Sequence, residues 1–172
     1  MSENYLVING KKTELTKEQL KQLGIEVRKN PFKRVKEHGS YYRITEYGNV
    51  ANLVETGDSL DYRLYENVNY FNDESFANQV ALRQLLYRKL LKFSYDADTH
   101  MTFAEMKSTN CGHINPAYVI KYNPKEKDFT VLVVHRPGIC DVTFSTLEAA
   151  EEAIKKVVQP FVKRHPAMLK DF

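Results

Sequence analysis

The sequence predicts an α+β fold made of two repeated units, each a small antiparallel hairpin or meander followed by a helix. Residues 41–70 and residues 117–143 both contain strand-like runs separated by turn residues. Each set ends at a phenylalanine, Phe71 or Phe144, that leads into apolar residues at helical spacing. Either unit alone would leave much apolar surface exposed to water, so we expect the two units to pack together.

Length and composition agree with one compact domain or two small units that share a core. The chain has 172 residues, of which 42% are apolar and 27% are charged, and the net charge is +3. This mildly basic balance falls short of a dedicated nucleic-acid binder. No apolar run approaches the roughly 20 residues that a membrane-spanning helix needs, and the N-terminus lacks the features of a signal peptide. We therefore expect a cytoplasmic protein without a membrane contact.

Residues 1–27 are predicted to form a small hairpin–helix module. Tyr5–Ile8 is typical of a short strand, and residues 12–15 are expected to return alongside it after a turn. Thr16 and Gln19 then have the spacing of a capping box, which indicates the start of a helix. That helix spans only about two turns, so it needs a surface on which to dock.

Residues 28–40 are predicted to be a basic linker between this module and the first repeat. The segment is rich in lysine and arginine. Asn30 precedes Pro31, and proline restricts the residue before it to extended conformations. We therefore expect an exposed, irregular connection here.

The first repeat is predicted over residues 41–93. Gly48 and Asn49 separate two strands, and a loose alternation of apolar residues over 60–70 favours a third extended piece. Asn72 has the character of an N-cap. The apolar spacing that follows predicts a helix from about residue 73 to residue 93.

The second repeat is predicted over residues 117–172, after a loop over residues 94–116 that has no clear periodicity. A loop of this length is uncommon in a compact domain and is often functional or disordered. The sequence from 117 predicts two strands and a third extended piece, and Ser145 then begins a helix with a capping box. Pro160 is expected to end or kink that helix.

Two cysteines and two histidines form the sharpest candidate for a metal site. Cys111 and His113 precede the strands of the second repeat, and His135 and Cys140 follow them, so a hairpin brings the pairs to one end. Four such ligands suit a tetrahedral zinc ion, or a cysteine nucleophile with a histidine base. The tight spacing of the first pair is unusual for zinc. We favour ordinary cysteines and loop histidines, and hence no cofactor and no catalytic residues.

Basic residues form the second candidate, as a binding surface. Three groups could contact phosphates, one in the linker, one on the first long helix and one near the C-terminus. The simpler interpretation is that these are solvated surface charges. The candidate binding residues are Lys29, Lys33, Arg34, Lys36, Arg83, Arg88 and Lys89.

The whole chain resembles a diffuse group of small phage and prophage proteins of Firmicutes. The resemblance rests on strand starts, turns and caps, namely Val7-Ile8-Asn9-Gly10-Lys11, Asn30-Pro31-Phe32, Tyr41-Tyr42-x-Ile44, Asn69-Tyr70-Phe71-Asn72 and Phe144-Ser145-Thr146. The group supplies no catalytic residues to carry over. It implies a phage accessory protein, and such proteins commonly bind a host protein and inhibit a defence nuclease, including CRISPR effectors. This chain lacks the tryptophan often found between the repeats in similar proteins, which indicates divergence there.

The sequence therefore favours a non-enzymatic phage accessory protein that binds a host protein or ribonucleoprotein complex, as an inhibitor of a CRISPR-type defence nuclease. We expect the basic linker and the loop over 94–116 to form the binding surface. The alternative is a nucleic-acid-binding accessory protein. A zinc-binding or cysteine-dependent enzyme is the third hypothesis. The oligomeric state is left open.

Overall fold

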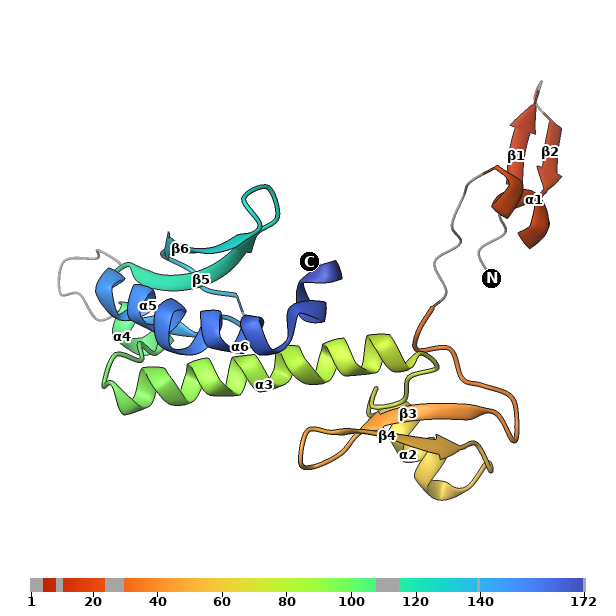
Figure 1. The fold of residues 1–172 in the computed structure, drawn as a ribbon, viewed down its shortest axis with the longest axis horizontal. Helices are drawn as coiled ribbons and strands as arrows, with labels where there is room; N and C mark the ends of the chain where they lie inside the picture. The colour runs from red at the N-terminus through yellow and green to blue at the C-terminus, as the bar shows by residue number, and fades with distance from the viewer. Residues whose placement is uncertain (1–4, 9–10, 24–29, 108–114, 139, 172) are drawn as a thin grey trace.

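The computed structural model describes residues 5–8, 11–23, 30–107, 115–138 and 140–171. These residues form antiparallel sheets and helices, so the predicted α+β class is confirmed (Figure 1). No helix within these ranges combines the length and apolar character needed to cross a membrane.

The N-terminal part is a hairpin followed by a short helix. Strand β1 (Tyr5–Ile8) pairs antiparallel with β2 (Lys11–Glu14), and α1 (Lys17–Gln22) follows. The predicted capping box is confirmed, because the Gln19 backbone N–H donates to Thr16 Oγ1 and the Thr16 N–H donates to Gln19 Oε1. The predicted turn between the strands lies outside the described residues. Figure 1 draws this part apart from the remaining elements.

The first unit begins with the hairpin of β3 (Ser40–Ile44) and β4 (Val50–Val54). Gly48 lies in the turn with a φ of 84°, a left-handed conformation that glycine adopts without steric cost. Tyr42 also pairs with Phe71 in an isolated antiparallel bridge, which places Phe71, three residues before the helix that begins at Glu74, against β3.

The third extended piece predicted over residues 60–70 is wrong. The chain instead forms helix α2 (Ser59–Glu66), whose N-cap is Asp58. The Asp58 carboxylate accepts hydrogen bonds from the backbone N–H groups of Leu60 and Asp61, and Asp61 completes a capping box. Acidic residues at the N-cap and three residues later stabilise the start of a helix. Here that stabilisation outweighs the strand preference indicated by the loose alternation of apolar residues.

The first long helix, α3 (Glu74–Asp96), is three residues longer at its C-terminus than the predicted end at residue 93. Its N-cap is Asp73, which accepts from the Phe76 N–H, and not the predicted Asn72. The Asn72 side chain has another role: its amide donates to the backbone carbonyls of Asn30 and Lys33. The start of the predicted linker is therefore docked against the start of α3.

Helix α3 is shared by both units of the fold (Figure 1). Near its N-terminus, Ala77 and Ala81 pack with Ile44 and Phe71 of the first unit. Further along, Leu86 packs into the cluster formed with the C-terminal helices, and α3 also contacts those helices directly. One helix thus supplies core residues to two sheets.

The unpatterned loop predicted over residues 94–116 is also partly wrong. Helix α3 continues to Asp96, and a further helix, α4 (Phe103–Lys107), follows within the predicted loop. Thr102 and Glu105 make reciprocal hydrogen bonds at its start, in the manner of a capping box. Residues 108–114 lie outside the described part of the chain.

The second unit contains three strands, β5 (Ala117–Asn123), β6 (Asp128–Val134) and β7 (Thr143–Phe144). All pairings are antiparallel and the order is β6-β5-β7, which leaves β6 and β7 as the two outer strands of this sheet. These strands agree with the predicted ones.

The C-terminal helical segment starts at Thr146, which caps the Ala149 N–H, and not at the predicted Ser145. The segment does not end at Pro160. Because proline has no N–H, the chain passes it through a π-helical turn, in which the Gln159 N–H bonds to the Ile154 carbonyl. The successive elements are α5 (Leu147–Ala153), η1 (Ile154–Val158), α6 (Gln159–Arg164) and η2 (Pro166–Asp171).

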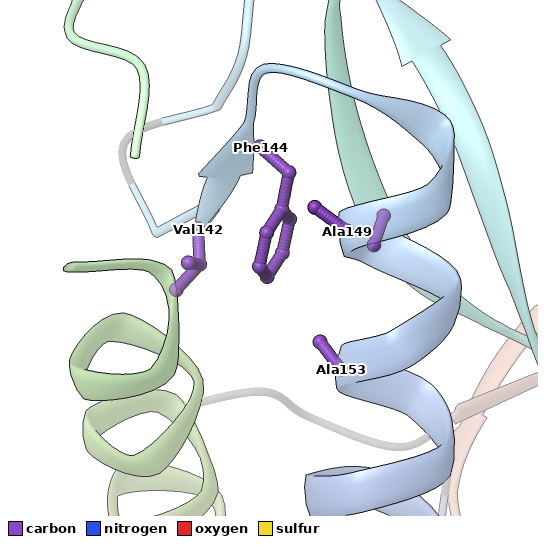
Figure 2. Close-up of a cluster of buried hydrophobic side chains, with 5 residues drawn as sticks. Val142, Phe144, Ala149 and Ala153 are labelled. Atoms are coloured by element: carbon purple, nitrogen blue, oxygen red, sulfur yellow. The ribbon is translucent and has the colours of Figure 1, made fainter. Parts of the chain in front are cut away.

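The core of the second unit is centred on Phe144, which is fully buried (Figure 2). Ala149 and Ala153 point from α5 toward this ring, and Val142 lies on the other side near the end of α3. Small alanine side chains allow α5 to approach the sheet closely.

The repeat itself stays a prediction. Tyr42 pairs with Phe71 as Tyr118 pairs with Phe144, and in both units the helix N-cap lies two residues after that phenylalanine. Helix α2, however, has no counterpart in the described residues of the second unit.

Candidate functional site

A cleft of about 660 Å³ opens on the first unit. Its walls come from the end of β3, the turn that follows, the connection from α2 to α3, and the outer face of α3. The lining residues are Phe32, Arg43, Ile44, Thr45, Glu46, Asn67, Val68, Asn69, Phe71, Val80, Gln84 and Arg88.

Two arginines in this cleft lack partners. Neither Arg43 nor Arg88 makes an ion pair or a side-chain hydrogen bond with any residue that the structure describes. The Arg43 Nε atom is buried and unsatisfied. A buried donor left without an acceptor costs about 1–3 kcal/mol, so the fold holds Arg43 in an incompletely satisfied position.

Several other cations of the chain do have acidic partners. The Arg34 guanidinium and the Lys92, Lys121 and Lys156 amines each form an ion pair with a carboxylate. The partners are Glu55, Asp96, Asp141 and Glu152, respectively. Arg43 and Arg88 have no such partner among the described residues.

The cleft wall is held rigid by an asparagine. The Asn69 side chain accepts from the Ile44 N–H and donates to the Ile44 carbonyl, both at 2.8 Å. This pair of bonds continues the edge of β3 as another strand would, and it fixes the α2–α3 connection next to Arg43. A preorganised wall lowers the entropic cost of binding a ligand.

Val68 occupies a strained position at the rim of the cleft. Its φ is 55°, at the residue that closes α2 in a Schellman motif, with the Val68 N–H bonded to Tyr65 O and the Asn69 N–H bonded to Leu64 O. Glycine is the usual residue there, and a β-branched residue with positive φ is a genuine outlier. The Val68 side chain is nevertheless 61% exposed. Such strain is typical of functional positions.

Six apolar or aromatic residues of the first unit are exposed, and one of them, Val68, lines the cleft. Tyr47, in the turn between β3 and β4, is the most exposed of them at 83%. Tyrosine and arginine are enriched in protein interfaces. We call this set the aromatic surface; its members are Tyr47, Val54, Leu60, Tyr62, Tyr65 and Val68.

A part-buried ion pair lies next to two tyrosines of the aromatic surface, Tyr62 and Tyr65. Arg34 binds the Glu55 carboxylate with both Nε and Nη2, at 2.9 and 2.8 Å, and the Tyr70 hydroxyl donates to Glu55 Oε2 at 2.8 Å. The bonds from Arg34 hold the pKa of Glu55 below its usual range, against the effect of burial. Burial and the bond to Glu55 raise the pKa of Tyr70 to about 12. The Arg34 guanidinium also lies over the exposed Tyr62 ring, 4.1 Å from its centroid.

A second buried carboxylate, Asp61, organises the start of α2. Its Oδ1 accepts from the Tyr41 hydroxyl at 2.6 Å, and its Oδ2 accepts from the backbone N–H groups of Thr56 and Gly57. Burial acts to raise the pKa of Asp61, but these hydrogen bonds outweigh it, and the pKa lies well below its usual range. Tyr41 stacks on Tyr70 with centroids 4.0 Å apart, so the two carboxylates belong to one cluster.

The structure places the predicted cations in different settings. Lys33 and Lys36 are exposed, and Arg34 is committed to Glu55. Arg83 and Lys89 are exposed on α3, and Arg88 alone of the predicted residues in the described ranges lines the cleft. Lys29 lies outside those ranges.

The predicted metal ligands are only partly described. His135 and Cys140 are exposed, and Cys111 and His113 lie outside the described residues. Within the described ranges, no three His, Cys, Asp or Glu side chains gather as a metal site would require.

Arg43 and Val68 are the functional candidates that the sequence did not reveal. A signal for Arg43 was present: the alternation of β3 places it on the same face as the fully buried Tyr41. A cation at an inward position is uncommon and invites a search for its partner. For Val68 there was no such signal, because its conformation depends on α2, which was not predicted.

Comparisons with protein-family models, with curated proteins and with solved structures give no match to this chain. We therefore derive its function from the residues and geometry of the cleft.

Proposed function

We propose that this is a non-enzymatic binding protein, which docks on a partner protein and receives an acidic side chain of that partner between Arg43 and Arg88. The observation that carries the proposal is that Arg43 and Arg88 line one cleft and have no ion-pair or hydrogen-bond partner among the described residues. A carboxylate suits this geometry, since guanidinium groups bind it with paired, charge-assisted hydrogen bonds.

The surroundings of the cleft favour a protein partner over a nucleic acid. The aromatic surface adjoins the cleft and offers apolar contact area that a phosphate backbone does not use. Four cations elsewhere are neutralised by carboxylates, and the net charge is only +3. Nucleic-acid binding through Lys33, Lys36 and Lys89 remains the alternative.

Geometry also argues against a catalytic role for Ser94 and His100, which have the residue types of a nucleophile and its base. Ser94 Oγ lies 3.2 Å from His100 Nδ1. Ser94 is fully buried, however, and its hydroxyl donates to the Leu91 carbonyl as part of α3. A substrate would have no access to that oxygen, so we assign the pair a structural role.

For the identity of the partner, we carry forward the proposal that comes from the resemblance to phage and prophage proteins. The partner is then a host protein or ribonucleoprotein of a bacterial defence system, such as a CRISPR-type nuclease. Insertion of a carboxylate into the cleft, with the aromatic surface packed around it, would let the protein cover a functional face of that nuclease.

The test compares arginine variants in a pull-down followed by calorimetry. Tagged wild-type protein captures the partner from bacterial lysate, and its affinity for the purified partner is then measured. Arg88→Ala and Arg43→Lys are each expected to weaken binding about 10-fold or more, since a hydrogen bond to a charged group contributes about 1.5–3 kcal/mol. Lys89→Ala, next to Arg88 and outside the cleft, is the matched control. Equal affinity of all four proteins would refute the proposal.

Nucleic-acid binding is tested separately by retention on immobilised single- and double-stranded DNA and RNA. A protein that binds through phosphates shows affinity that falls steeply as salt rises. We expect no retention at low salt. Strong, salt-sensitive retention that Lys33→Ala and Lys36→Ala reduce would favour the alternative.

A further inference from the structure

The second unit has an outer strand whose far edge is open. Strand β6 lies at the end of its sheet, and among the described residues its ladder partner is β5 alone. Every second residue of an antiparallel outer strand directs its N–H and C=O groups away from the sheet. Such an edge is a template for another strand.

The side chains of β6 do not protect this edge. Between Asp128 and His135 the strand carries no charged residue and no proline, the usual means of blocking edge pairing. Leu132 and Val133 are 48% and 58% exposed, on opposite faces of the sheet. A further strand beside β6 would cover both.

We infer that β6 pairs antiparallel with β6 of a second copy of this chain, across a two-fold axis at Leu132. In such a pair, residues whose N–H and C=O groups point away from β5 must lie opposite residues of the same kind in the second copy. This requires the two-fold axis to pass beside a residue, which then lies opposite its own copy. Centring on Leu132 places it opposite Leu132 of the second copy. It also places Val133 opposite Val131, so that both exposed side chains gain an apolar neighbour.

Charge complementarity favours the same register. Arg136 lies two residues beyond the end of β6, and if the pairing continues that far it meets Asp128 of the other copy, twice by symmetry. The two strands then join two sheets into one continuous sheet. A second copy of this chain matches the edge of β6 in strand length and apolar pattern, and in the opposite charges of Asp128 and Arg136.

This interface is independent of the cleft, since it lies on the second unit and uses none of the residues proposed to bind the partner. A monomer that still binds its partner would overturn the dimer alone, and a dimer that binds nothing would overturn the proposed function alone.

Sedimentation of the full chain over a range of concentrations tests the dimer. Wild-type protein should approach twice the 20.0 kDa mass of one chain as concentration rises. Leu132→Lys should remain monomeric, because two like charges would face each other across the axis. Leu147→Lys, at an exposed leucine of the same unit on α5, is the matched control and should dimerise normally. A monomeric wild type, or a dimer unaffected by Leu132→Lys, would refute the inference. Circular dichroism confirms that each variant is folded.

Cysteine cross-linking tests the register. In a Cys111→Ser, Cys140→Ser background, Leu132→Cys should form an intermolecular disulfide under mild oxidation, because its two copies lie directly opposite. Val133→Cys should not, because its two copies lie diagonally apart, beyond the reach of a disulfide. Faster cross-linking of Val133→Cys than of Leu132→Cys would contradict this register.

Discussion

The two units at either end of α3 are stabilised in opposite ways. The first unit buries two carboxylates, Glu55 and Asp61, in a network with Arg34, Tyr41 and Tyr70. The core cluster of the second unit is apolar, with the Phe144 ring between small alanine side chains. The surfaces also differ: in the described residues, the first unit presents two arginines without partners and exposed tyrosines, and the second presents the outer strand β6 with Leu132 and Val133 exposed.

This difference shows how each unit can serve a separate kind of contact. A hydrogen-bonded polar network fixes side chains in one geometry, which suits a cleft that must place two arginines. An apolar core tolerates more substitution of its side chains. In the second unit the backbone of the outer strand is then the main element available for recognition, by strand addition. Substitutions in the two units should therefore have effects that differ in size, location and pH dependence.

The largest expected effect is the loss of the central ring of the second unit. Phe144→Ala should lower the free energy of unfolding by about 3–5 kcal/mol, because it removes apolar burial and leaves a cavity. Denaturant unfolding followed by circular dichroism measures this. Leu147→Ala, at an exposed site nearby, is the control and should change stability by less than about 0.5 kcal/mol. Similar losses in both variants would show that Phe144 is not the centre of this core.

A smaller effect is expected from replacing Asp61, one of the two buried carboxylates of the first unit. Asp61→Asn should lower stability by about 2 kcal/mol, because the amide cannot accept all the hydrogen bonds that the carboxylate accepts. Hydrogen exchange should show faster amide exchange in β3, β4 and α2, with β5 and β6 unchanged. Asp58→Asn is the control, since asparagine also caps helices well. Uniform loss of protection along the chain would contradict separate stabilisation of the two units.

The two units should also differ in their response to acid. The pKa values of Glu55 and Asp61 lie below their usual ranges, so these groups stabilise the folded state above the unfolded-state pKa values, near pH 4. That stabilisation is lost as the pH falls through the folded-state values. Hydrogen-exchange protection, corrected for the intrinsic rate at each pH, should fall first in residues 40–71. Asp61→Asn should reduce this pH dependence, and equal acid sensitivity in both units would argue against it.

The smallest expected effect is a gain in stability at the rim of the cleft. Val68→Gly should stabilise the protein by up to about 1 kcal/mol, because glycine adopts the positive φ without strain. The same change should weaken partner binding, since it removes an exposed apolar side chain of the aromatic surface. Thermal unfolding and calorimetry report the two effects. If the variant were less stable than the wild type, Val68 would not be strained. If its affinity were unchanged, Val68 would not contribute to partner binding.

Local signals in the sequence predicted the elements that begin or end at clear turn or capping residues. Gly48 predicted the first hairpin turn, Thr16 and Gln19 the start of α1, and the spacing of apolar residues the body of α3. The prediction failed over residues 60–70, where Leu60, Tyr62 and Leu64 fit a strand and a helix equally well. Short segments carry too few residues to separate the two periods, and there the Asp58–Asp61 cap was decisive.

The site was less accessible to prediction than the fold. Seven cations were candidates, but charge alone does not distinguish Arg34, paired with Glu55, from Arg88, which has no partner in the described residues. Arg34 and Glu55 are 21 positions apart in the chain. Their pairing depends on how the predicted linker folds back on the first unit, and no local pattern encodes that path.

The sequence by itself determined the α+β class, most of the strands and helices, and several of the turns and caps, because these depend on backbone preferences and contacts within a few residues. Only the tertiary structure decided that Glu55 and Asp61 are buried, that Arg43 and Arg88 share a cleft, and that β6 is an outer strand of its sheet; in the part of the chain that the structure describes, neither arginine has a partner and β6 pairs with β5 alone. These properties depend on which distant segments meet, and the free energy of a buried charge is set by the neighbours that fold around it.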